Sequence, residues 1–371
     1  MRIAIILQQG FAFDPDRPDS VESVVRAMVA NSRYRETTTI VCDPLLETEP
    51  AGNEGFKVLR LPSFSGSRQR QRAIEAALGR LRPDYVEVHQ DIKTADYLAR
   101  RMPDTATVIY RHNEDKPQSN FYRRWLYVRR LAAPDALICV SEFIRQTYLT
   151  NNPRLDPHSF VATNGLQPEN WQAAPDGRRE KLIVFTGRPH PDKGIAQLVD
   201  ALAMVLPEFP DWRAALLCGQ WQKHCRMYDD FPVRAVEQKV KGKDRIELIR
   251  DAPIAEVRKT LQSAAIAVVP SIMADPFPLA AVEAHFTGTA LISSGSGGLR
   301  ELSGPGAAYL DAVTPQAIAD TLRGLMCDPE KRLALARKGQ QYVLEHHTAK
   351  KAAQRLDAIR DRIVADRAKR S

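Results

Sequence analysis

The chain has 371 residues, of which 44% are hydrophobic and 26% are charged, and its formal net charge is +8. This length exceeds what one hydrophobic core usually supports, so we expect two domains of ordinary size. The composition is that of a globular protein, and no run of about 18 apolar residues is present that could span a membrane. The apolar run at residues 3–7 is too short for a signal peptide, so we expect a cytoplasmic protein.

The five cysteines are odd in number and widely scattered: Cys42, Cys139, Cys218, Cys225 and Cys327. Most lie in or beside apolar runs or helical segments, which predicts reduced thiols and no disulfide framework. No C-x-x-C pair or His/Cys cluster suggests a zinc site.

In chain order, short β-branched runs alternate with segments of helical spacing. The strands expected in the first half are 3–7, 38–42, 57–61, 86–89, 108–110, 137–140 and 160–162, with helices at 20–31, 69–81 and 142–149 among them. Strands that alternate with helices predict a parallel sheet covered by helices on both faces.

A polar stretch with two prolines, residues 167–180, interrupts this alternation and is interpreted as a linker. The pattern then resumes, with strands expected at 182–186, 214–218, 246–249, 264–269, 291–293 and 307–310. We therefore predict an α/β protein of two doubly wound, Rossmann-like domains facing a central cleft: residues 1–166, residues 167–348, and a last helix, 349–371, that returns to the first domain. Ligands of such sheets bind beyond the carboxyl ends of the strands.

The most informative stretch follows the expected strand 264–269. A short loop carries Asp275, and Pro278 is suited to the first position of a helix that places Glu283 about one turn further on. The free N–H groups and the positive end of the helix dipole would lie near Phe277 and Leu279, where an anion such as phosphate binds. The two carboxylates are placed to accept hydrogen bonds from hydroxyl groups.

A second signal opens the second half of the chain. The strand 182–186 ends at Gly187, followed by Arg188 and then by Lys193 before Gly194. Two cations after a strand end suit a diphosphate leaving group, whose negative charge grows as the bond to it breaks. Surface charges beside a turn are the alternative interpretation.

Together these motifs resemble those of the retaining glycosyltransferases of family 4, which have the GT-B fold and use nucleotide-diphospho-sugars. Asp275 and Glu283, eight apart with Pro-Phe between them, resemble the E-x7-E motif of the family, although the first acid is Asp and Pro278 stands where Gly is common. The resemblance implies that Asp275 faces the donor sugar and that Glu283 holds the ribose. It also implies that the backbone of Phe277, Pro278 and Leu279 meets the sugar and the diphosphate.

The resemblance extends to other positions. It implies that Arg188 and Lys193, in the pattern that begins at Gly187, bind the diphosphate. Gly10 matches a loop that closes on the donor phosphate, His112 matches a histidine that contacts the donor sugar near its reacting carbon, and the backbone near Ile249 would read the base. A turn glycine and a hydrogen-bonded edge histidine are the alternative interpretations of Gly10 and His112. Ser141 resembles the family's strand-end serine and is explained equally well as a helix N-cap.

Basic residues gather at 68–82, at 111–131 and in the tail from 349, and in the second of these segments aromatic residues are interleaved with them. Such faces suit anionic lipid headgroups or phosphorylated acceptors. A solvated helix surface is the alternative, and no nucleic-acid-binding module is recognisable.

The resemblance implies a retaining hexosyltransferase that needs neither metal nor cofactor. It would move sugar from a UDP- or GDP-linked donor to a hydroxyl of an envelope glycan or glycolipid, as in lipopolysaccharide or polysaccharide synthesis, at the inner face of the plasma membrane. Two alternatives remain: a nucleotide-sugar epimerase of the same fold, and a non-catalytic nucleotide-sugar-binding protein. Asp14 and Asp16 match the D-x-D metal motif of a different fold, but their Pro-rich context favours a turn.

Overall fold

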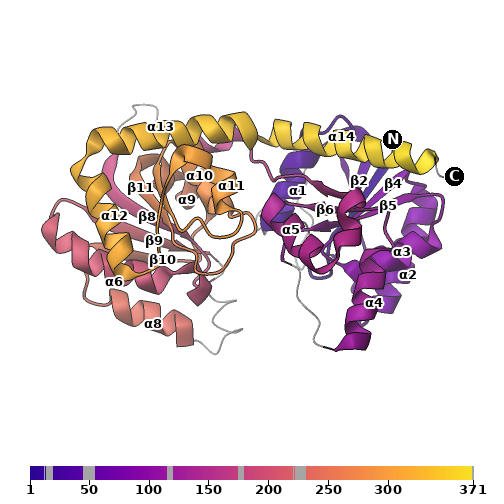
Figure 1. Cartoon of the computed structure of the whole chain (residues 1–371), viewed down its shortest axis with the longest axis horizontal. Coiled ribbons are helices and arrows are strands. Elements are labelled where there is room, and N and C mark those ends of the chain that lie inside the picture. The colour runs from indigo at the N-terminus through magenta and orange to yellow at the C-terminus, as the bar shows by residue number, and fades with distance from the viewer. Residues whose placement is uncertain are drawn as a thin grey trace. The chain divides into compact units, whose positions relative to one another are not determined.

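The computed structural model describes residues 1–11, 13, 20–44, 55–114, 120–173, 179–219, 221 and 231–369. The chain divides into two compact units, which Figure 1 shows with the elements labelled. Unit 1 comprises Met1–Leu166 and Ala349–Ser371, and unit 2 comprises Gln167–Thr348.

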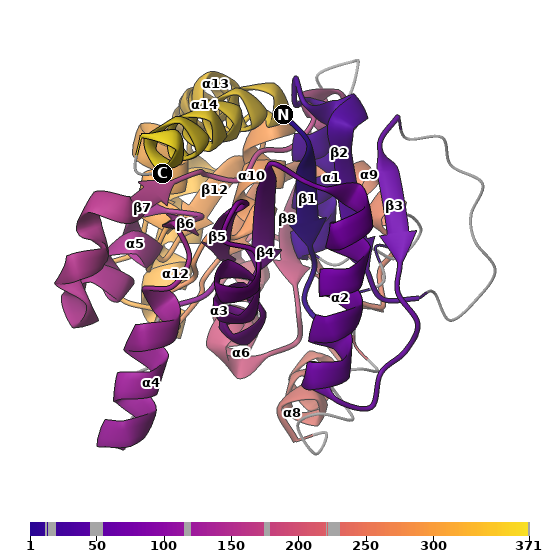
Figure 2. The ribbon, with the colours of Figure 1, turned by 90° about the vertical axis from the view of Figure 1, so that its right-hand side faces the viewer.

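Unit 1 is built on a sheet whose described strands are all parallel and follow the order β3-β2-β1-β4-β5-β6-β7 (Figure 2). The central strands are buried on both faces, as in other parallel sheets covered by helices. The strands are β1 (Ile3–Ile6), β2 (Thr38–Cys42), β3 (Lys57–Arg60), β4 (Tyr85–His89), β5 (Ala106–Arg111), β6 (Ala136–Cys139) and β7 (Ser159–Val161).

The helices of unit 1 begin where the sequence offers side-chain caps. Asp91 accepts hydrogen bonds from the backbone N–H groups of Lys93 and Thr94, and Ser141 Oγ accepts one from Ile144 at 3.2 Å, which confirms the N-cap interpretation of Ser141. The C-terminal helix α14 belongs to this unit and packs against α1 and β5. The helices are α1 (Ser20–Ala30), α2 (Ser67–Leu81), α3 (Ile92–Arg101), α4 (Phe121–Leu131), α5 (Glu142–Asn151) and α14 (Ala349–Ala368).

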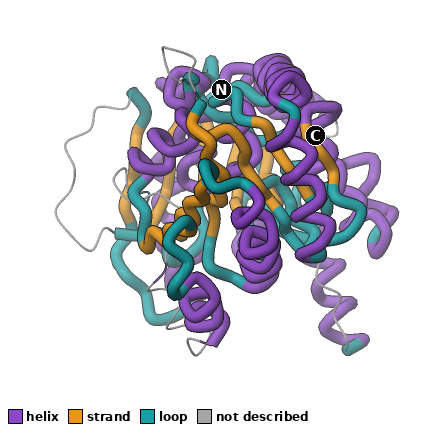
Figure 3. The backbone as a smooth tube through the Cα atoms, turned by 90° about the vertical axis from the view of Figure 1, so that its left-hand side faces the viewer, coloured by secondary structure: helices purple, strands orange, loops and turns teal. Residues whose placement is uncertain are grey.

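Unit 2 has a second sheet whose described strands are again all parallel, in the order β10-β9-β8-β11-β12-β13. Figure 3 shows helices lying on both sides of strands. The strands are β8 (Glu180–Gly187), β9 (Arg213–Cys218), β10 (Ile246–Arg250), β11 (Ala264–Val269), β12 (Ala290–Ser293) and β13 (Ala307–Tyr309).

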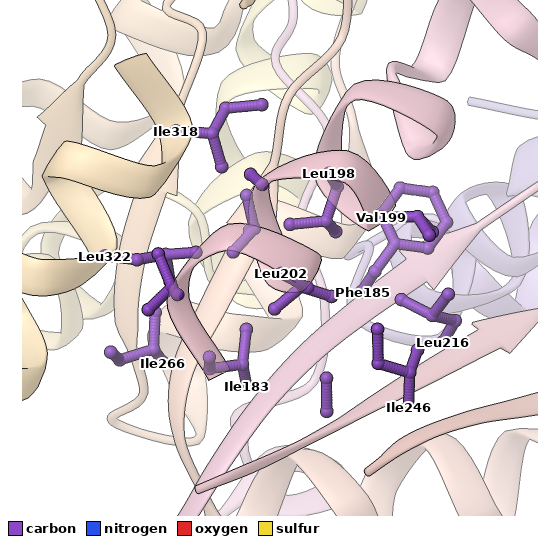
Figure 4. Packing of buried hydrophobic residues seen from close by; sticks show 14 of the residues in the cluster. Ile183, Phe185, Leu198, Val199, Leu202, Leu216, Ile246, Ile266, Ile318 and Leu322 are labelled. Atoms are coloured by element: carbon purple, nitrogen blue, oxygen red, sulfur yellow. The ribbon is translucent and has the colours of Figure 1, made fainter. Parts of the chain in front are cut away.

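The core of unit 2 forms where α6 and α12 pack on the sheet. In Figure 4, Leu198, Val199 and Leu202 of α6 meet side chains of the strands, among them Phe185 and Ile266. These residues are at most 2% exposed. The helices are α6 (Ile195–Val205), α8 (Phe231–Val240), α9 (Ile254–Ser263), α10 (Leu279–Phe286), α11 (Leu299–Ser303), α12 (Pro315–Cys327) and α13 (Pro329–His346).

The predicted fold class is confirmed: each expected strand is present within two residues of its expected ends, and the strands form two parallel sheets. One helix boundary was wrong. Pro278 is the N-cap of α10 with extended backbone (ψ 112°), so the helix begins at Leu279 and not at the proline. No helix in the described part of the chain is long and apolar enough to cross a membrane.

The linker interpretation of residues 167–180 was also wrong in part. Pro168–Trp171 form a turn of 3-10 helix, and Trp171 is only 4% exposed because its ring packs in unit 2 beneath the Arg258 guanidinium, 5.3 Å from the ring centre. Residues 174–178 lie outside the described residues. Cys42, Cys139 and Cys218 are buried free thiols, Cys327 is exposed and free, and Cys225 falls outside the described part.

Two of the three basic segments each place one arginine in the interior, whereas others of their cations, such as Arg72 and Lys350, are exposed. Arg70 is 2% exposed and pairs with Asp43 at 2.9 Å, and Arg360 of the tail is 2% exposed and pairs with two carboxylates. On helix α4, Arg123 and Arg124 are exposed, and the helix extends away from the body of unit 1 (Figure 2).

Candidate functional site

In the sheet of unit 2, the order in which successive strands are added changes direction between β8 and β11. The chain runs β8, β9, β10 towards one edge and β11, β12, β13 towards the other, so neighbouring loops diverge at the junction. Ligands of open α/β sheets bind at such a switch point, beyond the carboxyl ends of the strands. Arg188 and Lys193 follow β8, and Asp275 follows β11, so the candidate residues gather at this junction.

Lys193 and Asp275 are 82 positions apart in the sequence and form an ion pair between Nζ and Oδ2. Asp275 is 5% exposed and also accepts a hydrogen bond of 3.3 Å from Ser271 Oγ. An ammonium group has three N–H donors and a carboxylate accepts several hydrogen bonds, so both groups keep capacity for a ligand. The pair holds one cation and one acceptor side by side at the switch point.

The backbone clamps this pair from two sides. Gly194 lies in the left-handed region (φ +69°), and a Cβ on it would stand 2.0 Å from the carbonyl oxygen of Pro270. On the other side, Gly298 N–H donates to the Asp275 carbonyl at 2.8 Å, and a Cβ on Gly297 would be 2.4 Å from that oxygen. Only glycine permits these close approaches, so the glycine turn after β12 positions Asp275.

The other residues expected at the diphosphate lie on the same two segments, after β8 and after β11. Gly187 is the last residue of β8, and Arg188 after it has an exposed side chain. Phe277 and Pro278 are buried, and Leu279 opens α10, whose first N–H groups have no partner within the helix. The Phe277 ring packs edge-on against His347, with centroids 5.4 Å apart, so this histidine supports the loop and is not on the surface.

Glu283 lies on the second turn of α10 and is partly buried. Burial raises the pKa of its carboxyl group to about 7, and the positive charge of Arg258 opposes that rise. Arg258 is itself held over the Trp171 ring. The carboxyl group is therefore poised to change its charge near neutral pH, and any ligand that donates hydrogen bonds to it would favour the ionised form.

Ile249 is not grouped with these residues. It lies near the end of β10, an edge strand separated from β8 by β9, and its side chain is partly buried. Its strand ends at the same edge of the sheet as the others, because all the described strands of unit 2 are parallel.

In unit 1, Gly10 follows β1 with φ +92°, and a Cβ on it would meet no atom within 4 Å. The Gly10 N–H donates to Asp43 Oδ2 at 2.6 Å, and Arg70 bonds the other oxygen of Asp43 at 2.9 Å and the Leu7 carbonyl at 2.8 Å. Arg70 thus fixes the turn after β1, a role that its place in a basic run did not reveal.

His112 lies just after β5 and is 7% exposed. Its Nε2 is 2.9 Å from Nδ1 of His89, whose Nε2 is 2.9 Å from Glu87 Oε1, and Arg360 bonds the other oxygen of Glu87 at 2.9 Å. Glu87, His89 and Arg360 were not predicted from the sequence as part of this arrangement. A signal was present, since Glu87 and His89 share one face of a strand that is otherwise apolar and fully buried.

Among the described residues, no group of three or more His, Cys, Asp or Glu side chains is arranged to hold a metal ion. Asp14 and Asp16 lie outside the described residues. The site in unit 2 offers two cations, a helix N-terminus and two carboxylates. This set suits a ligand that carries both phosphates and hydroxyl groups.

Two family models match adjacent parts of the chain. The model for glycosyl transferases group 1 matches residues 168–342, and the model for glycosyltransferase family 4 matches residues 23–169. The chain belongs to glycosyltransferase family 4. The model for group 1 covers the site residues of unit 2, and the model for family 4 covers Glu87, His89 and His112.

Curated relatives of this family-4 chain are distant. It is 26% identical to alpha-maltose-1-phosphate synthase of Mycolicibacterium smegmatis, over 64% of this chain and 65% of that protein. It is 23% identical to lipopolysaccharide 1,2-N-acetylglucosaminetransferase of Salmonella typhimurium, over 73% of this chain and 71% of that protein. The chain thus spans slightly less than two thirds of the length of the first of these relatives.

Solved structures share the fold over almost the whole chain. Sucrose-phosphate synthase from Thermosynechococcus elongatus superposes with a TM-score of 0.82 at 16% identity, covering 99% of this chain and 100% of that one. Anabaena HepE in complex with UDP superposes with a TM-score of 0.78 at 16% identity, covering 96% and 99%. The family-4 chain therefore has the two-sheet architecture of these proteins.

Proposed function

We propose that the protein is a retaining glycosyltransferase that moves a hexose-type sugar from a UDP- or GDP-linked donor to a hydroxyl group. The observation that supports this most is the pairing of Lys193 with Asp275 at the switch point of unit 2, beside Arg188 and the start of α10. Membership of a family of glycosyltransferases and the likeness to a UDP complex favour a nucleotide-sugar as the ligand.

The roles follow from the chemistry of the groups. Arg188, Lys193 and the N–H groups at the start of α10 bind the diphosphate and neutralise the charge that grows on it as the glycosidic bond breaks, without a metal ion. Asp275 accepts hydrogen bonds from the sugar, while Glu283 accepts them from the ribose. Because Lys193 is already paired with Asp275, donor binding places a phosphate and a sugar hydroxyl on the two members of one ion pair.

The Glu283 carboxyl group couples donor binding to pH. Its pKa of about 7 in the free protein falls when ribose hydroxyls donate to it, because these bonds stabilise the ionised form. UDP binding at pH 6 is therefore expected to release a proton, and calorimetry in buffers of different ionisation enthalpy measures that release.

We also propose that the acceptor is an envelope glycan or glycolipid, met at an anionic membrane surface, as in lipopolysaccharide or polysaccharide synthesis. The support is α4, on which Phe121, Tyr122 and Trp125 are 86%, 65% and 49% exposed beside the exposed Arg123 and Arg124. The helix Phe121–Leu131 contains no acidic residue. Exposed aromatic rings interleaved with arginines suit the headgroup region of an anionic bilayer.

The deciding experiment measures donor binding and turnover together. We expect UDP-glucose or a GDP-linked hexose to raise the melting temperature by mass action, and the bound donor to be hydrolysed slowly in the absence of acceptor. Interconversion of the donor sugar without acceptor would identify an epimerase. Binding without hydrolysis or transfer to any tested glycan would identify a sensor, and a melting temperature unmoved by every donor would refute the proposal.

A further inference from the structure

Ser271 lies just after β11, in the loop that carries Asp275, and the proposed function gives it no role. It is 1% exposed, and its Oγ lies 3.3 Å from Asp275 Oδ2. A buried hydroxyl group that is bonded to a residue of the proposed donor site needs an explanation.

The backbone on both sides of Ser271 is fixed. Before it, the carbonyl oxygen of Pro270 is approached so closely by Gly194 that a Cβ there would stand 2.0 Å away. After it, the N–H group of Ile272 donates to the Asp192 carbonyl at 2.8 Å, and the next N–H group donates to the same oxygen at 3.3 Å. Ser271 is therefore held on a segment that is attached to the loop after β8.

The Ser271 hydroxyl shares its acceptor with Lys193. Both Lys193 Nζ and Ser271 Oγ bond Oδ2 of Asp275. A carboxylate in an ion pair only accepts hydrogen bonds, so the Ser271 hydroxyl is the donor in this contact. Since a carboxylate has about four lone-pair sites, roughly two on each oxygen, the two donors fill Oδ2.

The other oxygen of Asp275 is left for a ligand. Within the described part of the chain, the hydrogen bonds to the Asp275 side chain reach Oδ2 and none reaches Oδ1. Oδ1 is also not one of the fully covered side-chain atoms that lack a partner among the described residues, so a ligand can reach it.

We propose that Ser271 is a positioning residue which, together with Lys193, occupies Oδ2 of Asp275 and leaves Oδ1 as the oxygen that accepts from the donor sugar. With about two free sites on one oxygen, Asp275 accepts from two neighbouring hydroxyl groups of a hexose, and not from hydroxyl groups on opposite sides of the ring. The inference rests on the proposed function for the identity of the ligand. The arrangement around Asp275 does not depend on it.

Ser271 matters most when the donor enters. In the proposed function Lys193 then also binds the diphosphate, so its bond to Asp275 is expected to weaken. The Ser271 hydroxyl keeps its bond to Oδ2 and prevents the carboxylate from rotating about the Cβ–Cγ bond. The direction in which Oδ1 meets the sugar is thereby preserved.

A crystal structure of the ligand-free protein tests the arrangement without any variant. We expect Lys193 and Ser271 on the same oxygen of Asp275 and no protein donor on the other oxygen. Bonds from Lys193 and Ser271 to different oxygens, or protein donors on both, would overturn the proposal whatever the protein binds.

Ser271→Ala tests the role in binding. Titration calorimetry compares UDP with UDP-glucose, and GDP with GDP-mannose. In the pair that binds to the wild type, we expect Ser271→Ala to leave the Kd of the nucleotide within about twofold and to raise that of the nucleotide-sugar roughly fivefold, the effect of about one hydrogen bond. Ser303→Ala is the matched control, because Ser303 is another buried serine of unit 2, at 0% exposure, and should leave the ratio of the two Kd values unchanged.

This ratio separates positioning from a merely structural role. An equal loss of affinity for nucleotide and nucleotide-sugar, or no loss for either, would overturn the proposal. Failure of the proposed function would appear separately, as no binding of any of the four ligands by a protein with the expected arrangement around Asp275.

Discussion

Replacing Glu283 by glutamine is expected to stabilise the protein at pH 8 and at the same time to weaken its binding of UDP. In the folded protein the carboxyl pKa is raised from 4.5 to about 7, mainly by burial. Between these values the folded state holds a proton that the unfolded state has lost, so stability falls as pH rises through this window. Above pH 7 the full cost of the buried charge is present, and at pH 4 it is absent.

The magnitude follows from the size of the shift. A difference of about 2.5 pKa units corresponds to roughly 3 kcal/mol at about 1.4 kcal/mol per unit. For a domain of this size such a change moves the melting temperature by roughly 5–10 °C. At pH 8 the melting temperature of the glutamine variant should exceed that of the wild type by this amount. At pH 4.5 the two should differ by almost nothing, because wild-type Glu283 is largely protonated at that pH.

In the proposed site, the same substitution would remove a charged acceptor from the ribose. Hydrogen bonds to charged groups contribute about 1.5–3 kcal/mol, so the Kd for UDP should rise roughly 10- to 100-fold. Thermal melts from pH 4.5 to 8 and titration calorimetry with UDP measure the two effects. The control is Glu330→Gln on the exposed first turn of α13, which should change neither. Equal melting curves for wild type and Glu283→Gln at pH 8, or unchanged UDP affinity, would refute the reasoning.

Four other variants test the site and the surface. Arg188→Ala should leave the melting temperature within about 1 °C, because the side chain is exposed, but should weaken the binding of UDP more than the binding of uridine. Lys193→Ala should also lower the free energy of unfolding by about 3 kcal/mol, because Asp275 is left buried without its ion-pair partner. Equal melting curves for the two variants would contradict this expectation. Gly194→Ala should yield little folded protein in expression trials, since its Cβ would meet the Pro270 carbonyl at 2.0 Å, and a normal yield would be evidence against the clamp. Replacing both Arg123 and Arg124 by Glu should lower binding to phosphatidylglycerol vesicles at least tenfold in sedimentation assays, at about 1 kcal/mol per charge. An equally large effect from replacing two exposed cations of α13 would contradict the assignment of α4 as the membrane-binding helix.

The match between the predicted and observed sheets has a local cause. A strand buried on both faces must be apolar along its length, and such runs, separated by helical spacing, can be read from consecutive residues. The motifs around Asp275 and Arg188 were local in the same sense, because each is a strand end followed by a short loop. Their use as a donor site remains a proposal.

Contacts between side chains that are far apart in the sequence could not be predicted from such local patterns. Arg70 and Arg360 lie in basic runs. Nothing in these runs indicates that Arg70 bonds Asp43 beside the turn at Gly10, or that Arg360 bonds Glu87. The same holds for Trp171, which lies in a polar, proline-containing stretch but packs in unit 2. In each case the partner is chosen by the packing of distant elements, not by neighbours in the chain.

By itself, the sequence determined the alternation of strands and helices, because side-chain period and burial are properties of consecutive residues. Only the tertiary structure decided which charged groups face each other, because β8 lies beside β11 and α14 packs against α1 and β5. A parallel sheet brings together strand ends that are far apart in sequence. For this reason Lys193 pairs with Asp275, and for the same reason the hydrogen bonds that join Glu87, His89 and His112 could not be predicted from the sequence.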